Sequence, residues 1–153
     1  MTKFFLLILV TLLSSCCQPP VRAGVYSQDQ ISFLDAVRSM ETGGHPDPTN
    51  AVGSYNELGP MQITWAFWKD AVDHDPTIGG EYDDVRDIDY SYRIADAYFR
   101  RWAPDEWKDP RRHYQTLGAI FNGGPKGMEK GKAINYASRL ELRYQLIQGT
   151  WQS

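Results

Sequence analysis

One glutamate in the chain lies where a carboxyl group could serve as a proton donor. Ile31, Leu34 and Val37 recur at helical spacing and form one face of a predicted helix. Glu41 continues that face, so we expect its carboxyl group to lose water and its pKa to rise. Such an acid is still protonated near neutral pH and can protonate a glycosidic oxygen. The spacing also fits a helix-terminal glutamate that pairs with Arg38 or faces water.

Two other short segments could contribute polar groups to the same site. Gln62 lies in a turn at residues 59–63, where its amide could reach a substrate amide or hydroxyl, or simply bond to the backbone. Asn122 and Gly123 belong to an Asn-Gly-Gly-Pro stretch at 122–125. The glycines there could let a ligand approach the backbone closely, or they could just end a helix. Neither segment identifies a site by itself.

Taken together and in order, the three segments resemble the motifs of the lysozyme superfamily, which includes goose-type lysozymes and soluble lytic transglycosylases. They read Met-Glu-Thr-Gly-Gly at 40–44, Gly-Pro-Met-Gln-Ile at 59–63 and Asn-Gly-Gly-Pro-Lys-Gly at 122–127. The closer match is the invertebrate-type lysozyme (destabilase) family, to which Phe-Trp-Lys-Asp at 67–70 also corresponds. The resemblance covers about residues 31–143, which is nearly the whole domain after the leader.

The resemblance implies a mainly α, α+β lysozyme-like fold, in which a helical domain has a substrate cleft and a small irregular loop or hairpin region. It implies that Glu41 protonates the leaving-group oxygen between N-acetylmuramic acid and N-acetylglucosamine of peptidoglycan, without a cofactor. It also implies that Gln62, Tyr136 and the backbone near Asn122 and Gly123 line the cleft. In related enzymes a late tyrosine positions the catalytic glutamate or the sugar acetamide.

That late tyrosine is expected to be Tyr136, with Tyr144 as the second choice, although either could simply pack in the core. Animal members of the family also use an Asp shortly before the Gly-Pro turn, and this chain has none there. Glu57 and Asp47 are the candidates for a second carboxylate. A single-carboxylate mechanism stays open, in which Glu41 acts first as acid and then as base while the sugar C6 hydroxyl or a water attacks.

The sequence favours a lysozyme, and three alternatives to it remain open. A lysozyme would hydrolyse the β-1,4 bond, whereas a lytic transglycosylase would leave 1,6-anhydro ends. A catalytically silent module would only bind the cell wall. A different polymer, such as chitin, also fits the pattern. We expect a monomer whose partner is a peptidoglycan glycan strand.

Residues 1–23 resemble an export leader and tether, which leaves 24–153 as the catalytic domain. A positive Lys3 precedes an apolar run at 4–13 that is too short to span a bilayer. Leu-Ser-Ser-Cys at 13–16 resembles a lipobox and predicts lipidation at Cys16; Val-Arg-Ala at 21–23 is a competing cleavage site for ordinary secretion. Either leader predicts an exported protein, bound to a membrane only through a lipid anchor. No cysteine follows Cys17, so we expect no disulfide in the domain.

Composition excludes several other classes. With 42% hydrophobic residues the chain can bury a core, and a net charge of −3 without a basic run argues against nucleic acid. His45, His74 and His113 have no metal-ligand spacing, and we expect no metal site. Nine Tyr and five Trp exceed what a core of this size needs, and surplus aromatic residues often line carbohydrate clefts.

Helices are the elements that must position these residues. A capping-box pattern at Ser27 and Gln30 predicts a first helix that Gly43 and Gly44 end. Four further helices are predicted over 65–72, 89–102, 114–121 and about 133–147. The helix over 89–102 carries an apolar stripe that ends at Trp102. Residues 45–60 are rich in Pro, Asn, Gly and Asp and predict a loop or small irregular hairpin.

Overall fold

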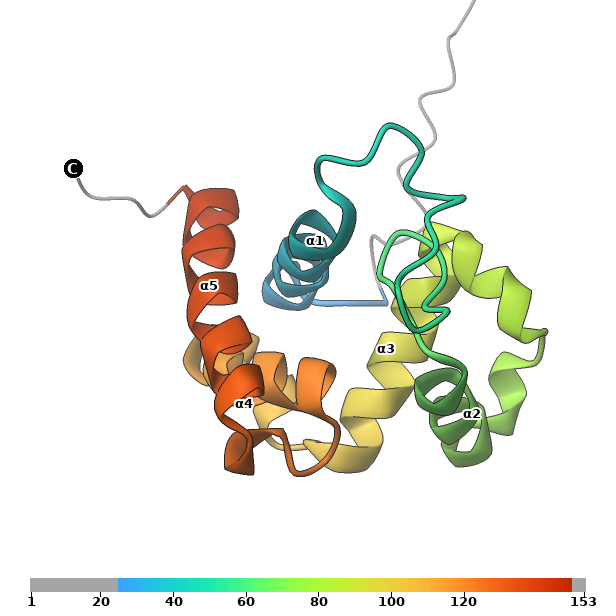
Figure 1. Cartoon of the computed structure of the whole chain (residues 1–153). Coiled ribbons are helices and arrows are strands. Elements are labelled where there is room, and N and C mark those ends of the chain that lie inside the picture. The colour runs from blue at the N-terminus through green and yellow to red at the C-terminus, as the bar shows by residue number, and fades with distance from the viewer. Residues whose placement is uncertain (1–24, 150–153) are drawn as a thin grey trace, which may run out of the picture.

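The fold is mainly helical, as the sequence predicts. The computed structural model describes residues 25–149. This part of the chain contains five α-helices, α1 (Gln28–Thr42), α2 (Trp65–His74), α3 (Ile88–Trp102), α4 (Pro110–Gly123) and α5 (Gly131–Gln148) (Figure 1). Short 3-10 turns, η1 (Pro76–Ile78), η2 (Tyr82–Arg86), η3 (Glu106–Lys108) and η4 (Gly127–Glu129), connect them.

The first helix begins as its capping box predicts. The Ser27 hydroxyl accepts a hydrogen bond from the Gln30 backbone N–H at 3.2 Å, and the Gln30 side chain accepts one from the Ser27 N–H at 2.9 Å. Helix α2 begins after Thr64, whose hydroxyl caps the Phe67 N–H at 3.1 Å. The expected starts of these two helices are confirmed.

The predicted start of the fourth helix, at Tyr114, was wrong. Helix α4 begins four residues earlier, at Pro110, and bends at His113, where φ is −123° and ψ is 17°. Proline is tolerated in the first helical turn because its missing N–H would have no partner there. Pro104 and Pro110 therefore bracket the short turn η3, and Pro110 opens the helix.

Of the region 45–60, predicted as a loop or small irregular hairpin, only the second part pairs, and the irregular hairpin spans residues 51–64. Leu58 pairs in antiparallel fashion with both Val52 and Ile63. The Leu58 and Ile63 backbones exchange hydrogen bonds of 3.0 and 3.1 Å. The Thr42 hydroxyl at the end of α1 donates to the Pro60 carbonyl at 2.7 Å. This bond holds the hairpin beside the end of α1, and so beside Glu41.

The core joins two groups of helices. Helix α1 packs with α4 and α5, and α2 packs on α3 (Figure 1). Phe33 of α1 links the groups, because its ring meets Phe99 of α3 edge-on at 5.6 Å and Trp107 of η3 at 5.9 Å. All three side chains are at most 2% exposed. This packing fixes the ends of the helices, where the polar residues of interest lie.

The predicted leader and Cys16 lie outside the described residues. Among residues 25–149, no helix has both the length and the apolar character needed to cross a membrane.

Candidate functional site

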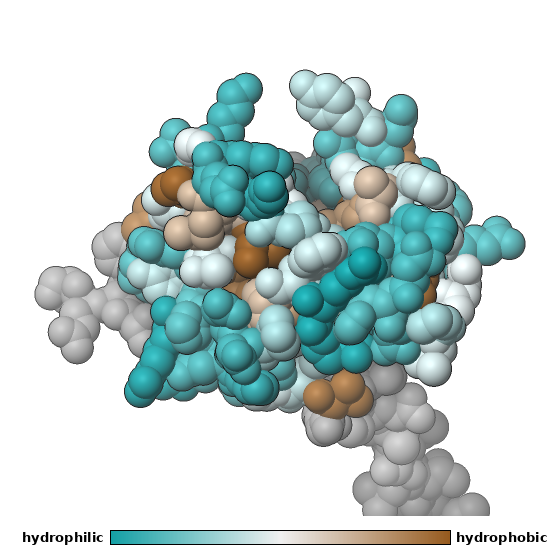
Figure 2. All heavy atoms as spheres, turned by 90° about the horizontal axis from the view of Figure 1, so that it is seen from below, coloured by the Kyte–Doolittle hydropathy of each residue, from teal (hydrophilic) through white to brown (hydrophobic). Residues whose placement is uncertain are grey.

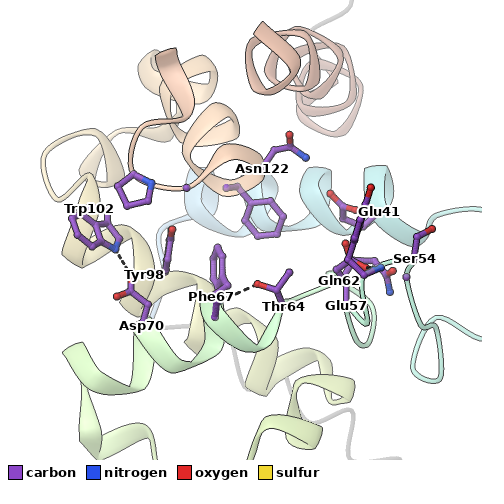
Figure 3. A pocket seen from close by; sticks show the side chains of 16 residues that line it. Glu41, Ser54, Glu57, Gln62, Thr64, Phe67, Asp70, Tyr98, Trp102 and Asn122 are labelled. Atoms are coloured by element: carbon purple, nitrogen blue, oxygen red, sulfur yellow. Dashed lines mark hydrogen bonds between the residues drawn. The ribbon is translucent and has the colours of Figure 1, made fainter. Parts of the chain in front are cut away.

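One pocket of about 710 Å³ collects most of the residues that the motifs single out. Its walls come from the end of α1, the 51–64 hairpin, α2, the end of α3 and the end of α4. Glu41, Glu57 and Gln62 gather at one end, and Asp70 and Trp102 lie at the other (Figure 3). Figure 2 shows the underside of the molecule, which is hollowed, with hydrophobic side chains inside a hydrophilic rim.

Glu41 is half-buried in the wall of this pocket. Burial raises the pKa of its carboxyl group, and the negative charge of Glu57 raises it further. The hydrogen bond from Tyr136 and the positive charge of Arg139 act in the opposite direction, but the pKa remains above its ordinary value. The raised pKa expected from the apolar stripe is therefore confirmed. The alternative pairing with Arg38 is not seen, since the Arg38 guanidinium lies 3.6 Å from Asp35.

Tyr136 lies behind Glu41 and holds it. The Tyr136 hydroxyl donates a hydrogen bond of 2.7 Å to Oε1 of Glu41. Tyr136 is only 6% exposed, and burial beside a carboxylate raises the pKa of its phenol far above the ordinary value. It therefore remains a hydrogen-bond donor at any ordinary pH. Tyr136 does not line the pocket as expected, but it does contact the acid. Tyr144, the second choice, accepts a 3.3 Å hydrogen bond from Gln148 near the far end of α5.

The hairpin presents Glu57 and Gln62 to the pocket across from Glu41 (Figure 3). One carboxylate oxygen of Glu57 accepts a hydrogen bond of 2.8 Å from the Tyr55 N–H. The Gln62 amide donates to the Gly59 carbonyl at 2.9 Å, so the expected alternative of a bond to the backbone occurs while Gln62 still lines the pocket. Glu57 is thus the candidate second carboxylate that the structure brings to this end of the pocket.

Gly53, which was not among the predicted site residues, makes room for both of these side chains. A Cβ atom at this position would lie 2.6 Å from the Gln62 side-chain oxygen and would overlap Oε2 of Glu57. The glycine therefore allows the two polar groups to sit over the hairpin backbone. The Ala-Val-Gly-Ser run at 51–54 contains no pattern that separates this glycine from an ordinary turn residue.

Besides Tyr136, two predicted site residues do not line the pocket. Asp47 is exposed in the loop after α1, where it accepts a 2.8 Å hydrogen bond from the Asn50 side chain. Gly123 packs against α5, since a Cβ there would lie 2.7 Å from Cβ of Ala133. Asn122 does line the pocket, and so does Gly124, whose φ of 79° favours glycine. Close approach to the backbone is available at Gly124 rather than at Gly123.

Aromatic side chains form the middle of the pocket. The rings of Phe67 and Tyr98 stack at 3.7 Å, and Phe121 meets Phe67 at 5.3 Å. Burial raises the pKa of Tyr98 to about 12, so its hydroxyl remains neutral. The surplus of aromatic residues in the composition and the Phe-Trp-Lys-Asp motif at 67–70 are the sequence signals for this surface, and neither says that Tyr98 and Phe121 join Phe67 here.

Within residues 25–149, no group of three or more His, Cys, Asp and Glu side chains is arranged to hold a metal ion. No protein-family model matches the chain, and no curated protein matches it either.

Proposed function

We propose that this protein is an exported muramidase that cleaves the β-1,4 bond between N-acetylmuramic acid and N-acetylglucosamine of peptidoglycan. The observation that carries the proposal is the environment of Glu41. Its carboxyl group lies half-buried in the pocket wall, and this burial raises its pKa. Such a group is suited to protonate a glycosidic oxygen near neutral pH. The three motifs shared with the lysozyme superfamily support the same substrate class, and a lysozyme-like fold is part of the proposal.

Tyr136 determines which oxygen of Glu41 delivers the proton. Because the Tyr136 hydroxyl donates to Oε1, that oxygen acts as an acceptor, and the acidic proton resides on Oε2. Oε2 transfers this proton to the glycosidic oxygen while the bond from that oxygen to the anomeric carbon breaks. Tyr136 then stabilises the carboxylate that forms, because a hydrogen bond to an ionised acceptor is stronger than one to a neutral acceptor.

Glu57 is the group that would complete a hydrolysis. Its carboxylate lines the pocket near enough to Glu41 for its charge to raise the pKa of the acid. In the hydrolytic reaction a water adds its oxygen to the anomeric carbon, and Glu57 accepts the proton that the water releases. In the transglycosylation alternative the C6 oxygen of the sugar attacks the anomeric carbon, the proton of that hydroxyl passes to the Glu41 carboxylate, and the proton first donated stays on the leaving-group oxygen. Mass analysis of the products separates the two chemistries, since only transglycosylation leaves 1,6-anhydro ends.

Replacement of the acid tests the proposal. Glu41→Gln keeps an acceptor for Tyr136 but has no proton to transfer, so clearing of a purified cell-wall suspension should fall by a factor of about 100 or more. Glu129→Gln is the matched control, because Glu129 is exposed on η4 and does not line the pocket. If Glu41→Gln clears walls as fast as the parent, the enzymatic assignment is wrong. A parent that binds walls without releasing fragments is the silent binding module instead.

Export to the periplasm or the outer membrane, or secretion, is the remaining part of the proposal, and it rests on residues 1–23. Changing Cys16 to Ser should release the protein from the membrane fraction if the Cys16 thiol carries a lipid. A protein that stays with the membrane after this change would contradict the lipid anchor. Soluble parent protein in the culture medium would favour the cleavage site at 21–23.

A further inference from the structure

The end of the pocket away from Glu41 carries an exposed tryptophan that the proposed chemistry does not use. Trp102 is the last residue of α3, lines the pocket and is 39% exposed. Figure 3 shows it beyond Phe67 and Tyr98, at the far end from Glu41. A large apolar ring that is exposed to water inside a pocket indicates a binding surface more strongly than a single exposed ring elsewhere on the protein.

Two charged residues hold this indole in place. The Trp102 indole N–H donates a hydrogen bond to the Asp70 carboxylate on α2 (Figure 3). The Arg101 guanidinium pairs with the same carboxylate at 2.8 Å and donates to the Asp70 backbone carbonyl at 2.9 Å. It also lies 4.9 Å from the centre of the Trp102 ring. The polar edge of the indole is therefore satisfied and its orientation is fixed before any ligand binds.

A second Trp–Asp hydrogen bond in the chain serves for comparison, because its tryptophan only packs in the core. The Trp107 indole donates to Asp96 at 2.7 Å, and Trp107 is only 2% exposed because it packs in the core. Trp102 has the same kind of hydrogen bond but leaves more than a third of its surface open. A hydrogen bond that only linked α2 to α3 would not require the ring of Trp102 to be exposed. The difference points to a ligand that covers the ring.

The surface formed by Trp102 and Asp70 has the chemistry of a sugar-binding site. An indole face packs well on the C–H face of a pyranose ring, and a carboxylate beside it accepts hydrogen bonds from sugar hydroxyls. Because Asp70 and Arg101 already restrain the ring, binding costs little side-chain entropy. We propose that Trp102, held by Asp70 and Arg101, is a stacking platform for a sugar unit of the glycan strand, remote from the bond that Glu41 cleaves.

This inference takes its substrate class from the proposed function, but its test measures binding and not turnover. The full chain with Glu41→Gln is titrated by calorimetry with soluble peptidoglycan oligosaccharides long enough to extend along the pocket. Adding Trp102→Ala should weaken binding about tenfold, because the stacking surface is lost. Adding Trp102→Phe should give an intermediate affinity, since a smaller ring remains. Trp65→Ala is the matched control, because Trp65 is 57% exposed and does not line the pocket.

The outcomes separate this inference from the proposed function. Equal affinity for the Trp102→Ala protein and the Trp65→Ala protein would overturn the platform, even if the parent cleaves cell walls. A parent that cleaves nothing, but whose oligosaccharide binding depends on Trp102, would overturn the proposed enzyme and support the platform. A parent that binds no oligosaccharide would overturn the platform as well. Circular dichroism of each variant checks that the helices are retained.

Discussion

Removing the hydroxyl of Tyr136 tests the electrostatics of the site most directly. In the Tyr136→Phe protein, Oε1 of Glu41 loses the donor that lies 2.7 Å away. That hydrogen bond favours the ionised carboxylate, so it works against the burial that raises the pKa of Glu41. Its loss should therefore raise the pKa of Glu41 further. The ring itself remains, so the packing of Tyr136, which is 6% exposed, is preserved.

The size of the change follows from the kind of hydrogen bond that is lost. A hydrogen bond to a charged group contributes about 1.5–3 kcal/mol. Glu41 faces the pocket, where water can replace part of the missing bond, so the lower end of that range applies. Since one pH unit corresponds to about 1.4 kcal/mol and the protonated acid also loses its weaker bond to Tyr136, the pKa of Glu41 should rise by at most about one unit. A proton donor with a higher pKa stays protonated to higher pH, and the alkaline limb of the pH–activity profile should move up by the same amount.

Two measurements check this expectation. The titration of Glu41 is followed by NMR of the labelled carboxyl carbon, and wall clearing is measured across the same pH range. Tyr144→Phe is the matched control, because Tyr144 is a buried tyrosine of α5 whose hydroxyl binds Gln148 instead. An unchanged or lowered pKa of Glu41 in the Tyr136→Phe protein would refute the reasoning. A merely structural role for Tyr136 would lower activity equally at every pH.

Three further substitutions test the electrostatics of the site and the packing of the helices around it. Glu57→Gln removes a negative charge that raises the pKa of Glu41, so the pKa of the Glu41 carboxyl group, followed by NMR, should fall; an unchanged pKa would contradict this. Glu41→Gln should raise the free energy of unfolding at neutral pH, because a carboxyl group with a raised folded-state pKa loses stability as pH rises through that pKa. Urea unfolding should show this gain shrinking as the pH falls through the raised pKa of Glu41 and disappearing below the ordinary pKa of glutamate. Gly127→Ala should cost about 2 kcal/mol or more in the same assay, since its Cβ would overlap the Ala119 backbone carbonyl, and an unchanged midpoint would count against the packing described.

Local patterns predicted the helices well, because the signals that start a helix lie within a few residues of each other. The capping box at Ser27 and the cap at Thr64 each involve residues three apart, and both helices begin where expected. The start of α4 was missed because Pro110 is compatible both with a break and with a first helical turn. The bend at His113 does not follow from any residue type in the sequence.

Contacts between residues far apart in the sequence limit how much of the site can be predicted. Glu41 and Tyr136 are 95 residues apart, and only the resemblance to known motifs suggested that they meet. The Asp70–Trp102 pair is 32 residues apart and connects α2 to α3. Helical periodicity assigns each residue to a face of its own helix, but it does not say which face of another helix lies opposite. The pairing of Asp70 with Trp102 was therefore not predictable from the pattern.

The two ends of the pocket nevertheless share one sequence feature. Glu41 continues the apolar stripe of α1 at the end of that helix, and Trp102 does the same on α3. Earlier members of the second stripe, such as Tyr90 and Tyr98, are 4% exposed, whereas Trp102 is 39% exposed. Each stripe thus extends past the edge of the core and into the pocket. The position that made Glu41 a candidate acid therefore also marks Trp102 as a candidate binding residue, for the same geometric reason.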